Sequence, residues 1–123
     1  MAETKPIVAF CCENSAAKAA EAVRDESVRA GVEVVKLPCA GKVEVGLVLK
    51  CFEKGYPAVL VLGCPIDNCK YLRGNCRAQK RVEVAQKALH DAGLDEKRIR
   101  MEFLSSVDTH KFEAVVREMK AAL

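Results

Sequence analysis

Short apolar runs alternate with longer amphipathic stretches along the chain. The apolar runs predict β-strands at 7–10, 32–37, 58–63 and 99–104. The first and third are continuously apolar, as the buried central strands of a parallel sheet are, whereas the second and fourth carry charges at alternate positions, as half-exposed edge strands do. This difference predicts an open parallel four-stranded sheet in the order 2-1-3-4.

Helical periodicity fills the segments between these strands. Helices are expected near 15–30, 43–54 and 77–92, and a last one begins after Asp108 or Thr109. The expected core positions of the last three helices are Val45, Val48, Leu49 and Phe52, then Val82, Ala85, Leu89 and Ala92, then Phe112, Val115, Val116 and Met119. Short connections and strict alternation predict one flavodoxin-like α/β domain over residues 1–123, with helices on both faces of the sheet.

Composition narrows the classes of function. The 123 residues carry a net charge of only +3, and aromatic content is 5% without Trp, which argues against a nucleic-acid partner. The N-terminus lacks the apolar core of a signal peptide and no apolar run approaches membrane-spanning length, so a cytoplasmic protein without a membrane partner is expected. Seven cysteines in a reducing compartment favour metal or redox chemistry over disulfides.

Most of these cysteines follow predicted strands. Cys11 and Cys12 come after the first strand, Cys39 after the second, and Cys64 and Cys69 after the third. In an open parallel sheet, ligands bind outside the carboxyl ends of the strands where the strand order reverses. The five thiols are therefore expected at one edge of the sheet, whereas Cys51, inside a predicted helix, is expected to be structural.

Thiolate ligands select zinc, cuprous copper or iron–sulfur clusters. Structural zinc sites usually contain C-x₂-C pairs, which this sequence lacks. Its C-x₄-C step at Cys64 and Cys69 also occurs in plant-type [2Fe–2S] ferredoxins, although there a C-x₂-C follows. The spacing alone thus leaves an iron–sulfur site, a structural zinc site and a metal-free thiol module open. A Rieske-like site would need two histidines on one iron, which argues against His110 as a ligand.

A thiol enzyme is the rival interpretation of the segment VAFCCENSAAK. This segment is similar to the strand–loop–helix of low-molecular-weight tyrosine phosphatases and arsenate reductases. Those enzymes need an arginine six residues after the nucleophilic cysteine, where this chain has Ala17 or Lys18. Lysine lacks the planar fork that grips an oxyanion through two hydrogen bonds, so the sequence argues against this chemistry.

Four longer stretches resemble one known family: FCCENSA, LPCAGKVE, LKCFEKGYPAVLVLGCPIDNCKYLRGNCRAQKRV and SSVDTHKF. Together they resemble the iron–sulfur delta subunit of methyl-viologen-reducing hydrogenase over nearly the whole chain. The resemblance implies a [2Fe–2S] cluster and a connector that passes electrons between a hydrogenase or formate dehydrogenase and the flavin-containing subunit of a heterodisulfide reductase. The cluster ligands it implies are Cys12, Cys39, Cys64 and Cys69. No independent substrate turnover is expected, because no catalytic acid/base pair stands out in the sequence.

The chain departs from the family pattern at three positions. Members often have a further cysteine where this chain has Ser15, and an aromatic residue where it has Cys76. Cys11 is additional to the minimal pattern. Four matching thiols suffice for one cluster, and Cys11 or Cys76 is the substitute if the position of Ser15 has to supply a ligand.

Overall fold

The computed structural model describes residues 6–13, 15–38, 43–63 and 74–122, with only the backbone described at 74–78. In chain order, the helices and strands are β1 (Ile7–Cys12), α1 (Ala16–Glu21), α2 (Glu26–Ala30), β2 (Val32–Leu37), α3 (Val45–Glu53), β3 (Val59–Gly63), α4 (Gly74–Asp91), a 3₁₀ turn (Glu96–Arg98), β4 (Ile99–Phe103) and α5 (Thr109–Ala121). Within the described ranges, no helix is long and apolar enough to cross a membrane.

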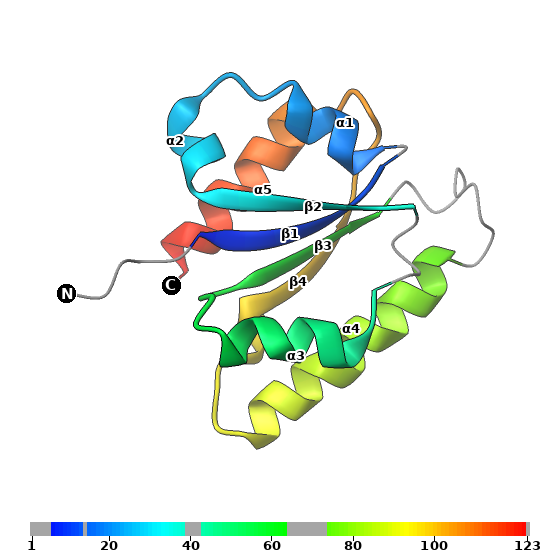
Figure 1. Cartoon of the computed structure of the whole chain (residues 1–123), viewed down its shortest axis with the longest axis vertical. Helices are drawn as coiled ribbons and strands as arrows, with labels where there is room; N and C mark the ends of the chain where they lie inside the picture. Colours follow the sequence, from blue (N-terminus) through cyan, green and yellow to red (C-terminus); the bar gives the residue numbers. More distant parts are fainter. Residues whose placement is uncertain (1–5, 14, 39–42, 64–73, 123) are drawn as a thin grey trace.

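The strands form an open parallel sheet in the order β2-β1-β3-β4 (Figure 1), which confirms the predicted fold class. β1 pairs with β2 from Ile7 opposite Val32 to Cys12 opposite Leu37, and with β3 on its other side. Every residue of β1 and β3 is buried, whereas β2 and β4 are partly exposed. Burial on both faces explains why the central strands are continuously apolar.

Helices cover both faces of the sheet (Figure 1). On one face, α1, α2 and α5 pack around Phe112, and on the other, α3 and α4 pack around Val48 and Leu89. We call the buried side chains around Phe112 the first core cluster and those around Val48 and Leu89 the second core cluster. Alternate residues of β1 point to opposite faces, so Ala9 belongs to the first core cluster and Phe10 to the second. Each fully buried large apolar side chain of this kind stabilises the fold by about 1.5–3 kcal/mol.

The predicted core positions are confirmed for α5, all four of which are buried. On α3, Val48 is buried and the other three predicted residues pack partly buried against the second cluster. On α4, Val82, Ala85 and Leu89 are buried, but Ala92 is exposed, because the helix ends one residue before it. The prediction was wrong for Ala92 alone on this helix.

The single helix predicted over 15–30 was also wrong, because the chain breaks there into α1 and α2. The Asp25 carboxylate accepts hydrogen bonds from the Ser27 amide (3.0 Å) and hydroxyl (2.7 Å), and so caps the N-terminus of α2. Such local bonds compete with a continuous helix. The break lets Val23 enter the first core cluster. Arg117 of α5 holds Asp25 from the other side at 2.7 Å.

Candidate functional site

The carboxyl ends of the central strands form one rim of the sheet. The amide of Glu13 donates to the Leu37 carbonyl at 2.8 Å, which ties the end of β1 to the end of β2. The amide of Leu104 donates to the Gly63 carbonyl at 2.8 Å, which ties the end of β3 to the chain leaving β4. The strand order reverses between β1 and β3, where sheets of this class bind ligands.

Cys12 is the last residue of β1 and lies at this rim. Its side chain is 3% exposed, and its Sγ lies 3.9 Å from the carbonyl oxygen of Pro38, which follows β2. Cys12 is absent from both core clusters. Cys12 is buried, but because it lies at the strand end and outside both packed clusters, its thiol can serve as a ligand with less repacking than a thiol inside a cluster.

Cys11, one residue earlier, lies in the first core cluster and is fully buried. Its Sγ donates to the Ala9 carbonyl at 3.7 Å. Burial first, and then the neighbouring Cys12, raise the pKa of the Cys11 thiol to about 12. Since the thiolate is the metal-binding form, Cys11 would have to leave the core to replace another ligand.

Ser15 follows the rim turn and is 4% exposed. Its amide donates to the Cys12 carbonyl at 3.2 Å. Although Ser15 is the N-cap residue of α1, its side chain makes no capping hydrogen bond, and its Oγ has no hydrogen-bond partner among the described residues. The family pattern marked Ser15 as the position of a missing thiol, but it did not predict this buried, unpaired hydroxyl.

The other predicted ligands, Cys39, Cys64 and Cys69, lie outside the described residues. Cys76 lies in α4, where only the backbone is described. Across the described ranges, no three His, Cys, Asp or Glu side chains gather closely enough to hold a metal ion. The rim residues that are described nevertheless fit a sulfur-ligated group, because a rim thiol and an unpaired buried hydroxyl lie within one turn of each other.

Cys51 and the histidines lie elsewhere. Cys51 is buried in α3, packs in the second core cluster and donates to the Leu47 carbonyl at 3.4 Å, in accord with the structural role expected for it. Burial is the main cause that raises the pKa of its thiol. His110 is fully exposed in the first turn of α5, 3.5 Å from the Glu113 carboxylate.

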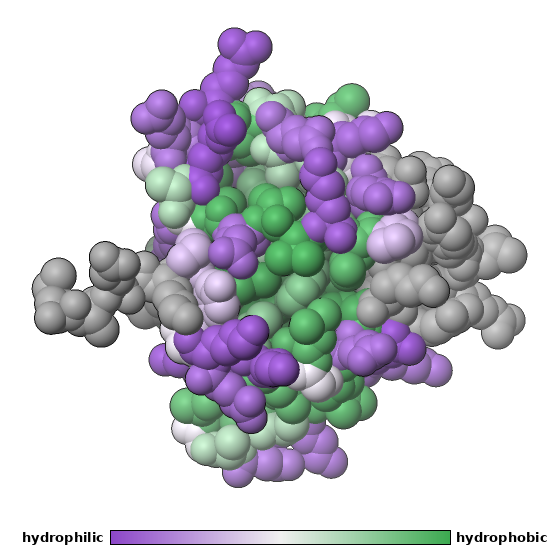
Figure 2. Space-filling model, viewed as in Figure 1, coloured by the Kyte–Doolittle hydropathy of each residue, from purple (hydrophilic) through white to green (hydrophobic). Residues whose placement is uncertain are grey.

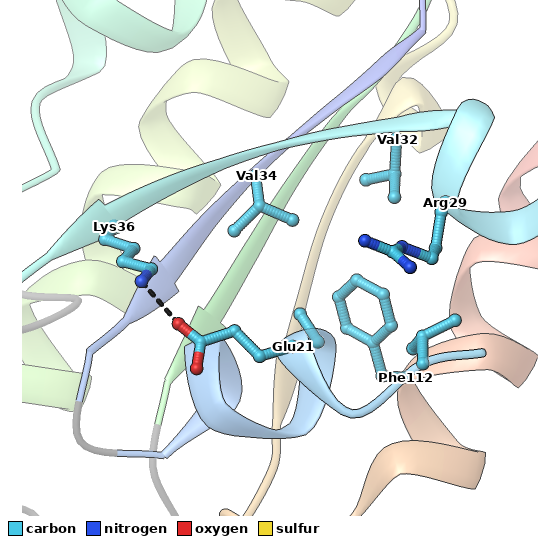
Figure 3. A pocket seen from close by; sticks show the side chains of 8 residues that line it. Glu21, Arg29, Val32, Val34, Lys36 and Phe112 are labelled. Atoms are coloured by element: carbon cyan, nitrogen blue, oxygen red, sulfur yellow. Dashed lines mark ion pairs between the residues drawn. The ribbon is translucent and has the colours of Figure 1, made fainter. Parts of the chain in front are cut away.

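A groove of about 300 Å³ runs along the outer side of β2, between that strand and α1, α2 and α5. Val32, Val34 and Lys36 project into it from β2, and Phe112 lies at its base (Figure 3). Figure 2, which shows the molecule from the same side as Figure 1, has apolar surface in the middle and polar side chains around it. Lys36 forms an ion pair with Glu21 across the groove (Figure 3). Among the described residues that line the groove there is no cysteine.

Comparison with known proteins identifies relatives across nearly the whole chain. The family described as methyl-viologen-reducing hydrogenase, delta subunit, matches residues 7–123. A protein of Methanocaldococcus jannaschii, named as the vhu iron–sulfur subunit of an F420-non-reducing hydrogenase, is 38% identical over 117 residues, which cover 94% of this chain and 87% of that protein. The protein of the same name from Methanopyrus kandleri is 34% identical over 121 residues, which cover 97% of this chain and 92% of that protein.

A different arrangement occurs in Methanosarcina acetivorans. There, a protein named as one subunit of a ferredoxin/F(420)H(2)-dependent CoB-CoM heterodisulfide reductase is 31% identical over 114 residues, which are 91% of this chain but only 14% of that protein. The stretch similar to this chain is thus part of a much longer polypeptide. By the extent of the family match and the identity to its relatives, the chain belongs to the family of the delta subunit of methyl-viologen-reducing hydrogenase.

Proposed function

We propose that the chain is an electron-transfer subunit that holds one [2Fe–2S] cluster through Cys12, Cys39, Cys64 and Cys69. The observation that carries the proposal is the position of Cys12 at the carboxyl end of β1, at the reversal of strand order. The relatives named iron–sulfur subunits support the coarser role of an electron-carrying subunit.

Connectivity supports convergence of the remaining ligands. Leu37 and Gly63 end the strands on either side of β1. In the sequence, Cys39 follows Leu37 by two residues and Cys64 directly follows Gly63. Two residues of chain span at most about 7 Å, so the segments that carry these thiols leave from strand ends next to Cys12.

The chain's own residues have three tasks in this role. Four thiolates complete the ligand sets of two irons, which accept and release one electron when the cluster is bound. The buried position of Cys12 keeps water away from the sulfur that it supplies. The backbone hydrogen bond between Glu13 and Leu37 ties the ends of β1 and β2 together, which restrains the two strand ends when the charge of the site changes.

The proposed partners are a hydrogenase or formate dehydrogenase module on one side and a flavin-containing heterodisulfide reductase-like protein on the other. The hydrogenase names of the relatives support the first. The long Methanosarcina relative supports the second, because there a stretch similar to this chain is covalently part of a heterodisulfide reductase. The proposed setting is the cytoplasm, where thiols stay reduced.

The test compares two cysteines of the chain after anaerobic purification. The wild-type protein should bind about two irons and two acid-labile sulfides per chain and give an EPR signal on one-electron reduction. Cys12→Ala should lose most of the iron and the signal, whereas Cys51→Ala, in α3, is the matched control and should retain both. The double variant Cys64→Ala/Cys69→Ala should also lose them.

Three results would contradict the proposal. One zinc and no iron in the wild-type protein would identify a zinc-bound interaction module instead. A metal-free protein whose activity is lost on alkylation of one cysteine would identify a thiol enzyme. A wild-type EPR signal in Cys12→Ala would exclude Cys12 as a ligand.

A further inference from the structure

The Ser15 hydroxyl is buried without a hydrogen-bond partner among the described residues. Native structures pair nearly all of their buried polar side chains, and a buried hydroxyl left unpaired destabilises the fold. No other buried side-chain oxygen or nitrogen of the described residues is in this condition. Such a group calls for a partner outside the described residues.

The hydroxyl is free because the backbone does the capping at this helix start. The side chain of a serine N-cap normally accepts a hydrogen bond from the amide two or three residues later. Here the amide of Lys18 donates to the Ser15 carbonyl at 3.0 Å, and the amide of Ala19 donates to the same oxygen at 3.1 Å. The side chain of Ser15 itself makes no capping hydrogen bond to α1.

The residue that carries this hydroxyl is bonded through its backbone to the proposed cluster ligand Cys12. The hydrogen bond from the Ser15 amide to the Cys12 carbonyl, 3.2 Å long, closes a four-residue turn. A turn of this kind keeps its first and last Cα atoms within about 7 Å. The backbone of Ser15 thus lies within one turn of Cys12.

We propose that the Ser15 hydroxyl donates a hydrogen bond to a sulfur atom of the site that Cys12 helps to form, and thereby raises its reduction potential. This inference rests on the proposed function. Reduction adds a negative charge to sulfur-bound iron, and an O–H donor to sulfur stabilises the more negative state. Ser15 is accordingly a positioning and tuning residue.

Ligation of iron by Ser15 is the less favourable alternative. A neutral serine hydroxyl is a hydrogen-bond donor at neutral pH, whereas binding iron in place of a thiolate would require loss of its proton in a buried place. Thiolate is also the softer ligand, which iron–sulfur clusters select. The four thiols of the proposed site complete its ligand set without Ser15.

The test compares Ser15→Ala with Ser15→Thr by redox titration of the EPR signal in the anaerobically purified full chain. In Ser15→Ala, the ratio of reduced to oxidised protein at a fixed potential should fall about tenfold, which corresponds to a potential lower by about 59 mV for one electron. Ser15→Thr retains the hydroxyl, and its potential should lie closer to the wild type. In the metal-free protein, Ser15→Ala should not lower the Tm, because no hydrogen bond is lost.

Each other outcome overturns the inference. An unchanged reduction potential in Ser15→Ala would exclude the proposed hydrogen bond. If Ser15→Thr had the same potential as Ser15→Ala, the shift would be due to packing and not to the hydroxyl. Loss of iron in Ser15→Ala from a folded chain would instead make Ser15 a ligand, and failure of Ser15→Ala to fold would make it structural. A wild-type protein that binds no iron would sink the proposed function itself, which is a different result.

Discussion

At the rim, the Ser15 hydroxyl is buried and lacks a partner among the described residues, whereas in the groove along β2 the Lys36 ammonium and the Glu21 carboxylate are half-exposed and paired with each other. Both regions contain polar groups beside an apolar wall. In the groove, Lys36 and Glu21 pair with each other, and Arg29, which also lines the groove, is exposed to solvent, so among the described residues no buried polar group there lacks a partner. At the rim, the pairing is incomplete. This difference is the reason why we infer a ligand at the rim and none in the groove.

The largest effect is expected for the labelling rate of the Cys11 thiol. Cys11 lies on the core side of β1, whereas Cys12 lies at the rim. With a pKa of about 12 instead of 9.0, the thiolate fraction of Cys11 at pH 8 falls about a thousandfold relative to an ordinary cysteine. Iodoacetamide should therefore label Cys11 up to about a thousandfold more slowly in the folded, metal-free protein than in denaturant.

The measurement is peptide mass spectrometry after timed labelling, in a Cys12→Ala chain so that the two adjacent thiols are not confused. Removal of Cys12 takes away only the smaller of the two causes of the raised pKa, since burial is the larger. Labelling of Cys11 at the denatured rate would mean that the end of β1 opens in solution. Cys11 would then become a real candidate for replacing a missing ligand.

The second prediction compares the free energy of unfolding of a variant at the floor of the groove with that of a variant at its wall. Phe112 is 1% exposed and packs in the first core cluster, whereas Val34, which lines the same groove, is 36% exposed. Phe112→Ala should lower the free energy of unfolding by about 3–5 kcal/mol, because it removes a large buried side chain and leaves a cavity. Val34→Ala, the matched control, should lower it by less than about 1 kcal/mol, since a partly exposed side chain loses little burial.

Urea-induced unfolding of the metal-free protein measures both changes. The iron content per folded chain should be the same in both variants after purification, because neither residue lies at the rim. If Val34→Ala were as destabilising as Phe112→Ala, another surface would have to cover the groove in solution. The contrast between a paired groove and an unpaired rim would then fail.

How far the sequence predicts this molecule depends on the range of the interactions involved. The sheet order and α5 follow from patterns carried by consecutive residues, such as the apolar run of β1 and the spacing of Phe112 and Val116. The break between α1 and α2 depends on a cap at Asp25 and on its contact with Arg117, which is 92 residues away. The local spacing of apolar residues around Asp25 carries no information about this distant contact, so it predicted one continuous helix.

The rim was predictable only in part. Alternation along a strand already implies that Cys11 and Cys12 point to opposite faces, so the sequence contained the information that separates them. The state of the Ser15 hydroxyl could not be foreseen, because serine at the start of a helix normally caps it. Only the structure shows that the Lys18 amide donates its hydrogen bond to the Ser15 carbonyl and that the Ser15 side chain makes no capping bond.

The smallest effect is expected for the ion pair of the groove. The hydrogen bond with Lys36 lowers the pKa of Glu21, and the same bond raises the pKa of Lys36. A carboxyl whose pKa is lower in the folded state contributes stability above its unfolded pKa and loses it as the pH falls through the folded value. A lysine whose pKa is raised contributes stability below its unfolded pKa and loses it as the pH rises through the folded value. The pair should therefore stabilise the fold between about pH 4.5 and 10.5.

Lys36→Ala should produce a small drop in Tm at pH 7 and low salt, and the drop should vanish in 1 M salt, where charges are screened within about 3 Å. Lys80→Ala, an exposed lysine on α4 across the sheet, is the matched control and should leave the Tm unchanged. Thermal unfolding followed by circular dichroism measures both. Exposed ion pairs are weak. A large, salt-independent drop in the Tm of Lys36→Ala would therefore mean that Lys36 makes a stabilising contact other than its ion pair with Glu21. The groove would then have an unmet partner of its own, as we infer for the rim.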